Sequence, residues 1–119
     1  MILVNLEKWK VGWGFEMEMK DLQKFAKEES ERLKKRMGYG DKEFILTNAI
    51  KLGEELGEVN EEVLKYFKYA RKEKMVKENE LAHEIADVLI VSTILAESLG
   101  IDIEGALKEK IKIAEERYK

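Results

Sequence analysis

The sequence of 119 residues has no cysteine and a single histidine. The lack of cysteine excludes disulfide bonds, a zinc–thiolate site and a thiol nucleophile. With one histidine, any metal site must use oxygen ligands, and these favour Mg²⁺, Mn²⁺ or Ca²⁺. The sequence also lacks an uncharged run near the ~18 residues that span a bilayer, and its start lacks a signal-peptide pattern. We therefore expect a cytoplasmic protein with no membrane partner.

The sequence also has no excess of basic residues. The formal net charge is −3, and the 22 basic residues are spread along the chain instead of forming one patch. This distribution predicts no nucleic-acid partner. Charged residues make up 39% of the sequence, mostly lysine and glutamate. That balance is typical of thermophilic proteins, although small helical proteins share it.

The first 15 residues differ from the rest of the chain because they show no helical pattern. Between Trp9 and Phe15 apolar residues alternate with others, a period of two that suits a short strand or an extended arm. We predict an N-terminal arm over residues 1–15 and one helical domain over residues 16–119. The aromatic residues of the arm either pack on the helical body, or stack on a nucleobase or cover a second subunit.

Four stretches with a helical apolar period follow the arm. They are expected at residues 17–37, 42–74, 80–99 and 103–119. Gly38 to Asp41 breaks the pattern after the first stretch, and Asp41, Asn79 and Asp102 are the expected N-caps of the other three. The third stretch is apolar almost all round, so it belongs in a core.

These features predict an all-α domain, an antiparallel four-helix bundle. The second and third helices carry more apolar surface than the first and fourth can cover. We therefore expect that a homodimer, or a dimer of dimers, completes the core.

Two pairs of acidic residues interrupt the apolar pattern of the middle helices. Glu55 and Glu58 border the apolar stripe of the second helix, and Glu84 and Asp87 lie three apart on the third. Because the third helix belongs in a core, Asp87 is expected to be buried, and it is too far from the helix start for the helix dipole to explain it. If the two helices pack antiparallel, four carboxylates converge, and such a group requires cations. Hard divalent ions are the natural choice.

Three segments resemble the MazG-like group of all-α nucleoside triphosphate pyrophosphohydrolases. They read K-L-G-E-E-L-G-E-V from Lys51, E-I-A-D-V-L-I from Glu84 and K-I-K-I-A-E-E-R-Y from Lys110. The resemblance implies that Glu55, Glu58, Glu84 and Asp87 bind Mg²⁺, for which Mn²⁺ is a possible substitute. It also implies that Lys110, Arg117 and Tyr118 contact the triphosphate of a nucleotide substrate.

The activity implied by this resemblance is hydrolysis of a nucleoside or deoxynucleoside triphosphate between its α and β phosphates, as in house-cleaning of the nucleotide pool. Glu54, next to the metal ligands but turned away by one position, is a candidate general base. Phosphoribosyl-ATP hydrolysis is an alternative within the same chemistry. A non-catalytic helical module that binds metal or a partner is an alternative of another class. A di-iron bundle is disfavoured because it uses E-x-x-H pairs, for which no histidine stands at the needed offset.

Overall fold

The computed structural model describes residues 16–67 and 78–118, and this part of the chain is all helical apart from short connections. Its helices are α2 (Met19–Met37), α3 (Asp41–Tyr66), α4 (Glu78–Ser98) and α5 (Ile103–Glu116). The all-α prediction is confirmed. The predicted arm over residues 1–15 lies outside the described residues. Within the described part, no helix is long and apolar enough to span a membrane.

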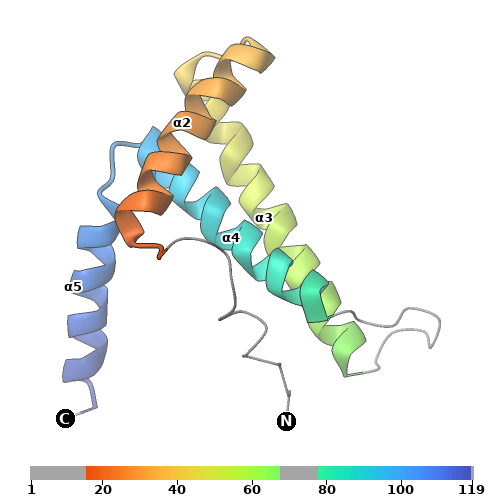
Figure 1. Ribbon diagram of the computed structural model, residues 1–119, viewed down its shortest axis with the longest axis vertical. Coiled ribbons are helices and arrows are strands. Elements are labelled where there is room, and N and C mark those ends of the chain that lie inside the picture. The colour runs from red at the N-terminus through yellow and green to blue at the C-terminus, as the bar shows by residue number, and fades with distance from the viewer. Residues whose placement is uncertain (1–15, 68–77, 119) are drawn as a thin grey trace.

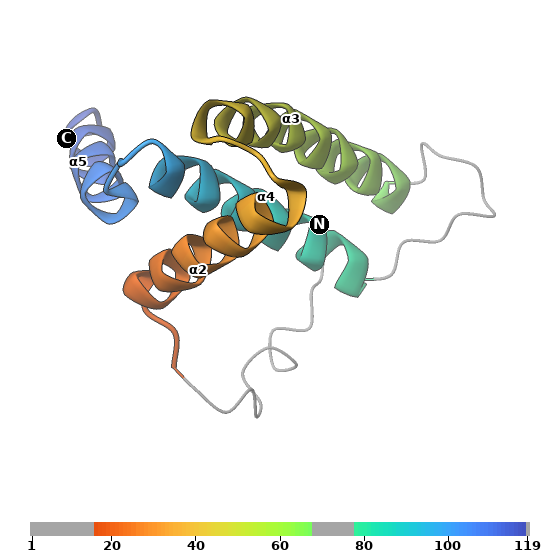
Figure 2. The same cartoon turned by 90° about the horizontal axis from the view of Figure 1, so that it is seen from above.

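Helix α4 is the central element of the fold. It lies between α2 and α3 and contacts both, while α5 turns away from the other helices after a short connection (Figures 1 and 2). The colours of Figure 1 show that α3 and α4 run antiparallel. The expectation that the third apolar stretch belongs in the core is confirmed, because α4 supplies most of the buried apolar side chains. These are Leu81, Val91, Ile94 and Ala96.

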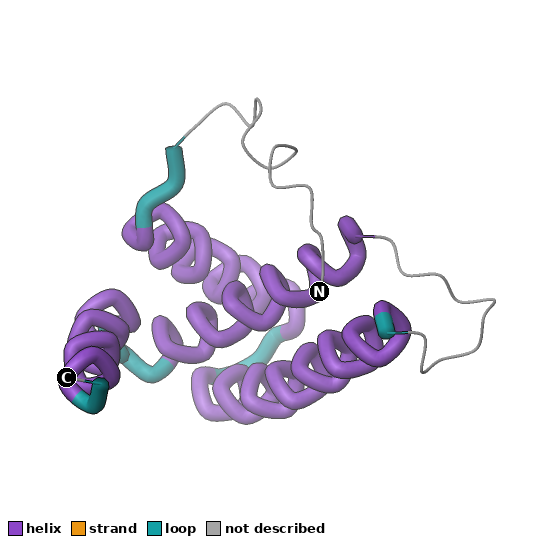
Figure 3. Tube along the Cα trace, turned by 90° about the horizontal axis from the view of Figure 1, so that it is seen from below, coloured by secondary structure: helices purple, strands orange, loops and turns teal. Residues whose placement is uncertain are grey.

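The core itself is small. Ala26 of α2, Phe44 of α3 and Ile94 of α4 form its buried cluster. Among the described residues, no large side chain is less than 2% exposed. Figure 3 shows why: α2 and α3 diverge from the turn that joins them and lie on either side of α4, so the three helices do not close into a full bundle.

The turns between helices follow the glycine signals of the sequence. Gly38 ends α2 with φ of 68°, and Gly100 follows α4 with φ of 71°. A side chain would strain the backbone at both positions, since positive φ is unfavourable for residues with a Cβ. The break that was predicted at Gly38 is therefore confirmed.

Several predicted helix boundaries are wrong by a few residues. Helix α3 ends at Tyr66, short of the predicted Lys74. Its N-cap is Gly40, so Asp41 is the first helical residue instead of the cap. Helix α4 already starts at Glu78, which places Asn79 inside the helix. Asp102 does occupy the N-cap position of α5, and its carboxylate accepts a hydrogen bond from Gln23 of α2 at 3.1 Å.

Candidate metal centre

Glu55 and Glu58 stand on the side of α3 that borders α4. Their position follows from the helical period, because Phe44 and Asn48, which are buried, lie on nearly the same side of the helix. The side-chain amide of Asn48 donates to the backbone carbonyl of Phe44 at 2.9 Å, so its burial leaves no unpaired donor there. Glu55 lies about two turns further along this side.

Glu84 stands on α4, across the helix interface from the Glu55/Glu58 pair. Each of the three side chains offers one carboxylate oxygen, and these oxygens lie within 4.8 Å of one another. Glu55 and Glu84 are half-buried and Glu58 is exposed. We call these three residues the acidic cluster. Its members come from two antiparallel helices, and their carboxylates converge as the sequence spacing leads one to expect.

Asp87 lies beside the acidic cluster without being one of the three converging residues. It is close enough for its negative charge to raise the pKa of both Glu55 and Glu84. The expectation that Asp87 is buried is wrong, since its side chain is exposed in this chain. Its exposure means that the described helices leave this face of α4 open to solvent.

Burial and mutual repulsion make the acidic cluster electrostatically unfavourable. A hydrogen bond shared with Glu58, then burial, then the charges of Glu58, Asp87 and Glu55 raise the pKa of Glu84 to about 7. Burial, followed by the charges of Glu58 and Asp87, raises the pKa of Glu55, and the positive charge of Lys51 offsets part of that shift. One oxygen each of Glu55 and Glu84 is buried without a hydrogen-bond partner.

No basic side chain of the described residues forms an ion pair with the acidic cluster. Converging carboxylates with unpaired, buried oxygens are costly unless a cation binds them. The donors are all hard oxygens, which matches the preference of Mg²⁺ or Mn²⁺. The residues present therefore fit a divalent metal ion, as the sequence leads one to expect.

Glu62, also on α3, has a different environment that sequence reasoning did not foresee. Its carboxylate accepts a hydrogen bond from the Lys65 ammonium at 2.9 Å, and the residue is 9% exposed. Lys65 also pairs with Glu61 at 3.4 Å. The i, i+3 spacing of Glu62 and Lys65 could have predicted this ion pair. Glu62 is thus held by its own helix and lies outside the acidic cluster.

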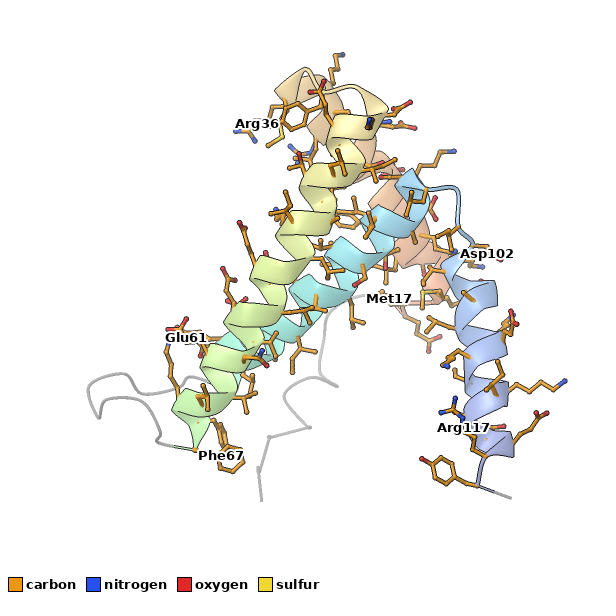
Figure 4. The ribbon with its side chains drawn as sticks, turned by 180° about the vertical axis from the view of Figure 1, so that it is seen from behind. Met17, Arg36, Glu61, Phe67, Asp102 and Arg117 are labelled. Atoms are coloured by element: carbon orange, nitrogen blue, oxygen red, sulfur yellow. The ribbon has the colours of Figure 1, made fainter. Side chains whose placement is uncertain are left out.

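The other candidate residues are not gathered at the acidic cluster within one chain. Glu54 is exposed on α3 next to Glu55. Lys110 lies on α5, Arg117 is the C-cap of that helix and Tyr118 follows it, all three exposed. Figure 4 shows Arg117 at the far end of α5, on the opposite side of the molecule from Glu61 of α3.

A separate apolar groove lies between α2 and α4 and has a volume of about 450 Å³. None of the acidic-cluster residues lines it, so this groove and the acidic cluster are different features of the molecule. Its lining residues are Met17, Asp21, Leu22, Phe25, Ala86, Leu89 and Ile90.

Comparison with known proteins gives one finding. No curated protein and no solved structure matches the chain. The model of the MazG-like family matches residues 46–119, a segment that contains the acidic cluster, Asp87 and the whole of α5. Because this match covers more than half of the sequence, the chain belongs to the MazG-like family.

Proposed function

We propose that this chain hydrolyses a nucleoside or deoxynucleoside triphosphate between the α and β phosphates and releases a nucleoside monophosphate and pyrophosphate. The observation that carries the proposal is the convergence of Glu55, Glu58 and Glu84, with two buried oxygens that have no partner. The MazG-like family is associated with nucleoside triphosphate pyrophosphohydrolases. The cost of this arrangement without a cation favours a metal-binding site, which this hydrolysis requires.

In this proposal Glu55, Glu58, Glu84 and Asp87 bind Mg²⁺, or Mn²⁺ in its place. A bound divalent ion supplies Lewis-acid stabilisation of the phosphate oxygens and lowers the pKa of a water. The four carboxylates fix the position of the ion at the edge of the α3–α4 interface, where Asp87 and Glu58 are exposed to solvent. The exposure of these two side chains leaves this edge accessible to a triphosphate.

Glu54 is the proposed proton acceptor for the attacking water. Its carboxylate is exposed, and its position on α3 directly precedes Glu55, so it lies near the acidic cluster without being part of it. Its test is a comparison of Glu54→Gln with Glu54→Ala in Mg²⁺. Both variants should keep triphosphate binding and lose turnover, and the acidic limb of the pH–rate profile should flatten. A normal pH profile in Glu54→Gln would remove this residue from the role.

The test of the activity is a substrate panel with product identification. Canonical, deoxy and modified nucleoside triphosphates, and phosphoribosyl-ATP, are each incubated with the full chain and Mg²⁺. We expect pyrophosphate as the product, no orthophosphate, and no turnover after chelation of the metal. Release of orthophosphate, or turnover that survives the chelator, would contradict the proposal. The panel also separates nucleoside triphosphates from phosphoribosyl-ATP.

We also propose that the working form is a homodimer. On the helical wheel, the edge of the α3–α4 pair opposite the acidic cluster is apolar, and its large side chains are exposed. Large exposed apolar side chains that share one edge favour an interaction site. The exposed side chains on this edge and on the neighbouring outer face of α3 are Leu46, Ile50, Leu56, Leu64, Ile85 and Leu89.

Light scattering tests this proposal with two variants that each lower the net charge by one. Ile50, which is 68% exposed, changes to glutamate in the first, and Lys24, exposed on α2, changes to glutamine in the second. We expect a dimer for the parent chain and for Lys24→Gln, and a monomer at micromolar concentration for Ile50→Glu. A parent chain that stays monomeric would overturn the proposal.

A further inference from the structure

The apolar groove between α2 and α4 has walls of large side chains that stand half open. Met17 is 59% exposed, Leu89 58% and Phe25 46%. The lining is apolar except for Asp21, whose carboxylate accepts a hydrogen bond from the backbone N–H of Glu18 at 2.8 Å. An open apolar groove of about 450 Å³ is typical of a site that another group covers.

The groove begins where the N-terminal arm ends. The arm, residues 1–15, lies outside the described residues, and Met17, two positions later, already lines the groove. Leu22 and Phe25 stand three and six residues into α2, within ~9 Å of its first residue along the helix axis. Four extended residues span at most ~14 Å, so Trp13 can reach the whole α2 wall from Met17.

The sequence of the arm matches an apolar groove. Alternate side chains of an extended segment share one side, so a period of two gives one side to the groove and the other to water. Gly12 and Gly14 flank Trp13, and glycine permits the change of direction that brings the arm back over α2. The apolar residues of the alternating stretch are Trp9, Val11, Trp13 and Phe15.

The charges of the arm and the groove are also complementary. The arm has two lysines, Lys8 and Lys10, and one acid, Glu7. Asp21 is the only charged residue that lines the groove. A net positive segment beside a single carboxylate is a favourable combination. The arm is also tethered at the groove, so its effective concentration there is on the order of mM, which favours it over a free partner.

We propose that residues 9–15 occupy the α2–α4 groove of their own chain, with the Trp13 indole as the anchor against Phe25 and Leu89. The arm then covers apolar surface that the small core of α2, α3 and α4 does not enclose. Leu89 also belongs to the edge proposed for the homodimer, so the docked arm borders that interface. No residue of the acidic cluster lines the groove, so this inference is independent of the proposed function.

Tryptophan fluorescence tests the docking, because both tryptophans of the sequence, Trp9 and Trp13, belong to the arm. Emission moves to shorter wavelength and resists quenching by acrylamide when an indole leaves water. We expect both properties in the parent chain. Ala86→Glu places a charged side chain in the groove and should shift emission to the wavelength of the chain unfolded in urea. Circular dichroism checks that its helices persist.

The matched control is Ala49→Glu, the same change at an exposed position of α3 outside the groove. It should leave emission and quenching at the parent values. Two results would overturn the proposal: parent emission equal to that of the unfolded chain, or parent-like emission in Ala86→Glu. The first means that the arm stays in water, and the second means that its indoles pack elsewhere.

A double-mutant cycle tests the contact even if Ala86→Glu does not fold. The free energy of unfolding is measured in urea for Trp13→Ala, Phe25→Ala and the double variant. Side chains in contact give effects that do not add, whereas distant ones add. We expect a double variant less destabilised than the sum of the two single changes. Phe67→Ala, at a half-exposed phenylalanine outside the groove, is the control and should add to Trp13→Ala. Equal additivity in both cycles would refute the contact.

Cross-linking decides whether the arm docks on its own chain or on a second copy. The sequence has no cysteine, so Gly12→Cys and Ala86→Cys introduce the only thiols. With both in one chain, a short bismaleimide should give a cross-link within that chain, with a yield that does not change on dilution. The pair Gly12→Cys and Ala49→Cys is the control and should react far less. A cross-link found only between differently tagged chains would mean that the groove receives the arm of a second copy, which contradicts the proposal.

Discussion

Glu55 and Glu62 stand on the same helix, seven residues apart and thus on the same side, yet their environments differ. Glu62 is 9% exposed and its carboxylate binds the Lys65 ammonium of its own helix at 2.9 Å. Glu55 faces Glu58 and Glu84, and no basic side chain of the described residues pairs with it. Each carboxylate has one buried oxygen without a hydrogen-bond partner.

This difference in charged neighbours distinguishes a structural carboxylate, Glu62, from a proposed metal ligand, Glu55. A buried acid with a nearby lysine has its charge compensated by the fold, and removal of the lysine alone would leave that charge buried and unpaired. A group of acids without a cation destabilises the folded chain until a cation arrives from outside. Burial alone does not distinguish the two cases, because both glutamates are partly withdrawn from solvent. The two cases are distinguished by the charge of the nearest ionised side chain.

The largest expected effect comes from exchanging the two glutamates for glutamine. Glu55→Gln removes a proposed metal ligand, so pyrophosphate release with Mg²⁺ should fall by more than about 100-fold, since even outer partners of metal ligands are worth 10–100-fold. Glu62→Gln should retain activity within about 3-fold, because Glu62 lies outside the acidic cluster. Steady-state assays of both variants at saturating Mg²⁺ provide the measurement.

The control for this pair is the thermal stability of the metal-free variants. Glu55→Gln removes a repelled charge and should leave Tm unchanged or higher. Equal loss of activity in the two variants would show that the contrast between Glu55 and Glu62 has no functional meaning.

A smaller effect is expected from removing the lysine. Lys65→Met leaves the Glu62 carboxylate without its 2.9 Å partner in a site where both side chains are less than 20% exposed. We expect Tm to fall by roughly 5 to 10 °C. Lys108→Met is the matched control, because it breaks the exposed pair with Glu104 and should change Tm by roughly 2 °C or less. Similar changes in the two variants would mean that burial adds nothing to the Glu62–Lys65 pair.

Much of the fold could be predicted from the sequence because helical periodicity is a local signal. The apolar stretch around Ile94 identified the central helix, and the glycine at position 38 identified the break after α2. The end of α3 was missed, since the residues after Tyr66 continue the same pattern of charged and apolar residues. The predictions of N-caps at Asp41 and Asn79 were wrong, because acids and asparagines also occur inside the first turn.

The candidate site shows the same limit. The i, i+3 spacing predicted that Glu55, Glu58, Glu84 and Asp87 would converge if the two helices pack antiparallel. The oxygens of the first three do converge, and Asp87 lies beside them. The exposure of Asp87 could not be predicted, since it depends on where the edge of the interface falls. The position of Lys110 and Arg117 depends on the orientation of α5, which the described residues of one chain do not direct toward α3.

The smallest expected effect is the pH dependence of the metal-free chain. The pKa of Glu84 is raised to about 7 by Glu58, burial and the neighbouring acids, so between pH 4.5 and 7 the folded chain holds a proton that the unfolded chain has lost. Stability falls with rising pH where the folded state binds more protons. We therefore expect Tm in EDTA to decrease from pH 5 to pH 8, and Mg²⁺ to reverse the decrease at pH 8.

Two variants serve as controls for this pH dependence. Glu84→Gln should flatten the plot of Tm against pH, whereas Glu62→Gln should keep its slope. The pKa values of Glu29 and Asp102 are lowered, so these two groups lose their protons below this pH window and do not change Tm within it. A Tm that rises from pH 5 to pH 8 in EDTA would mean that the carboxylates of the acidic cluster do not repel one another in the folded chain.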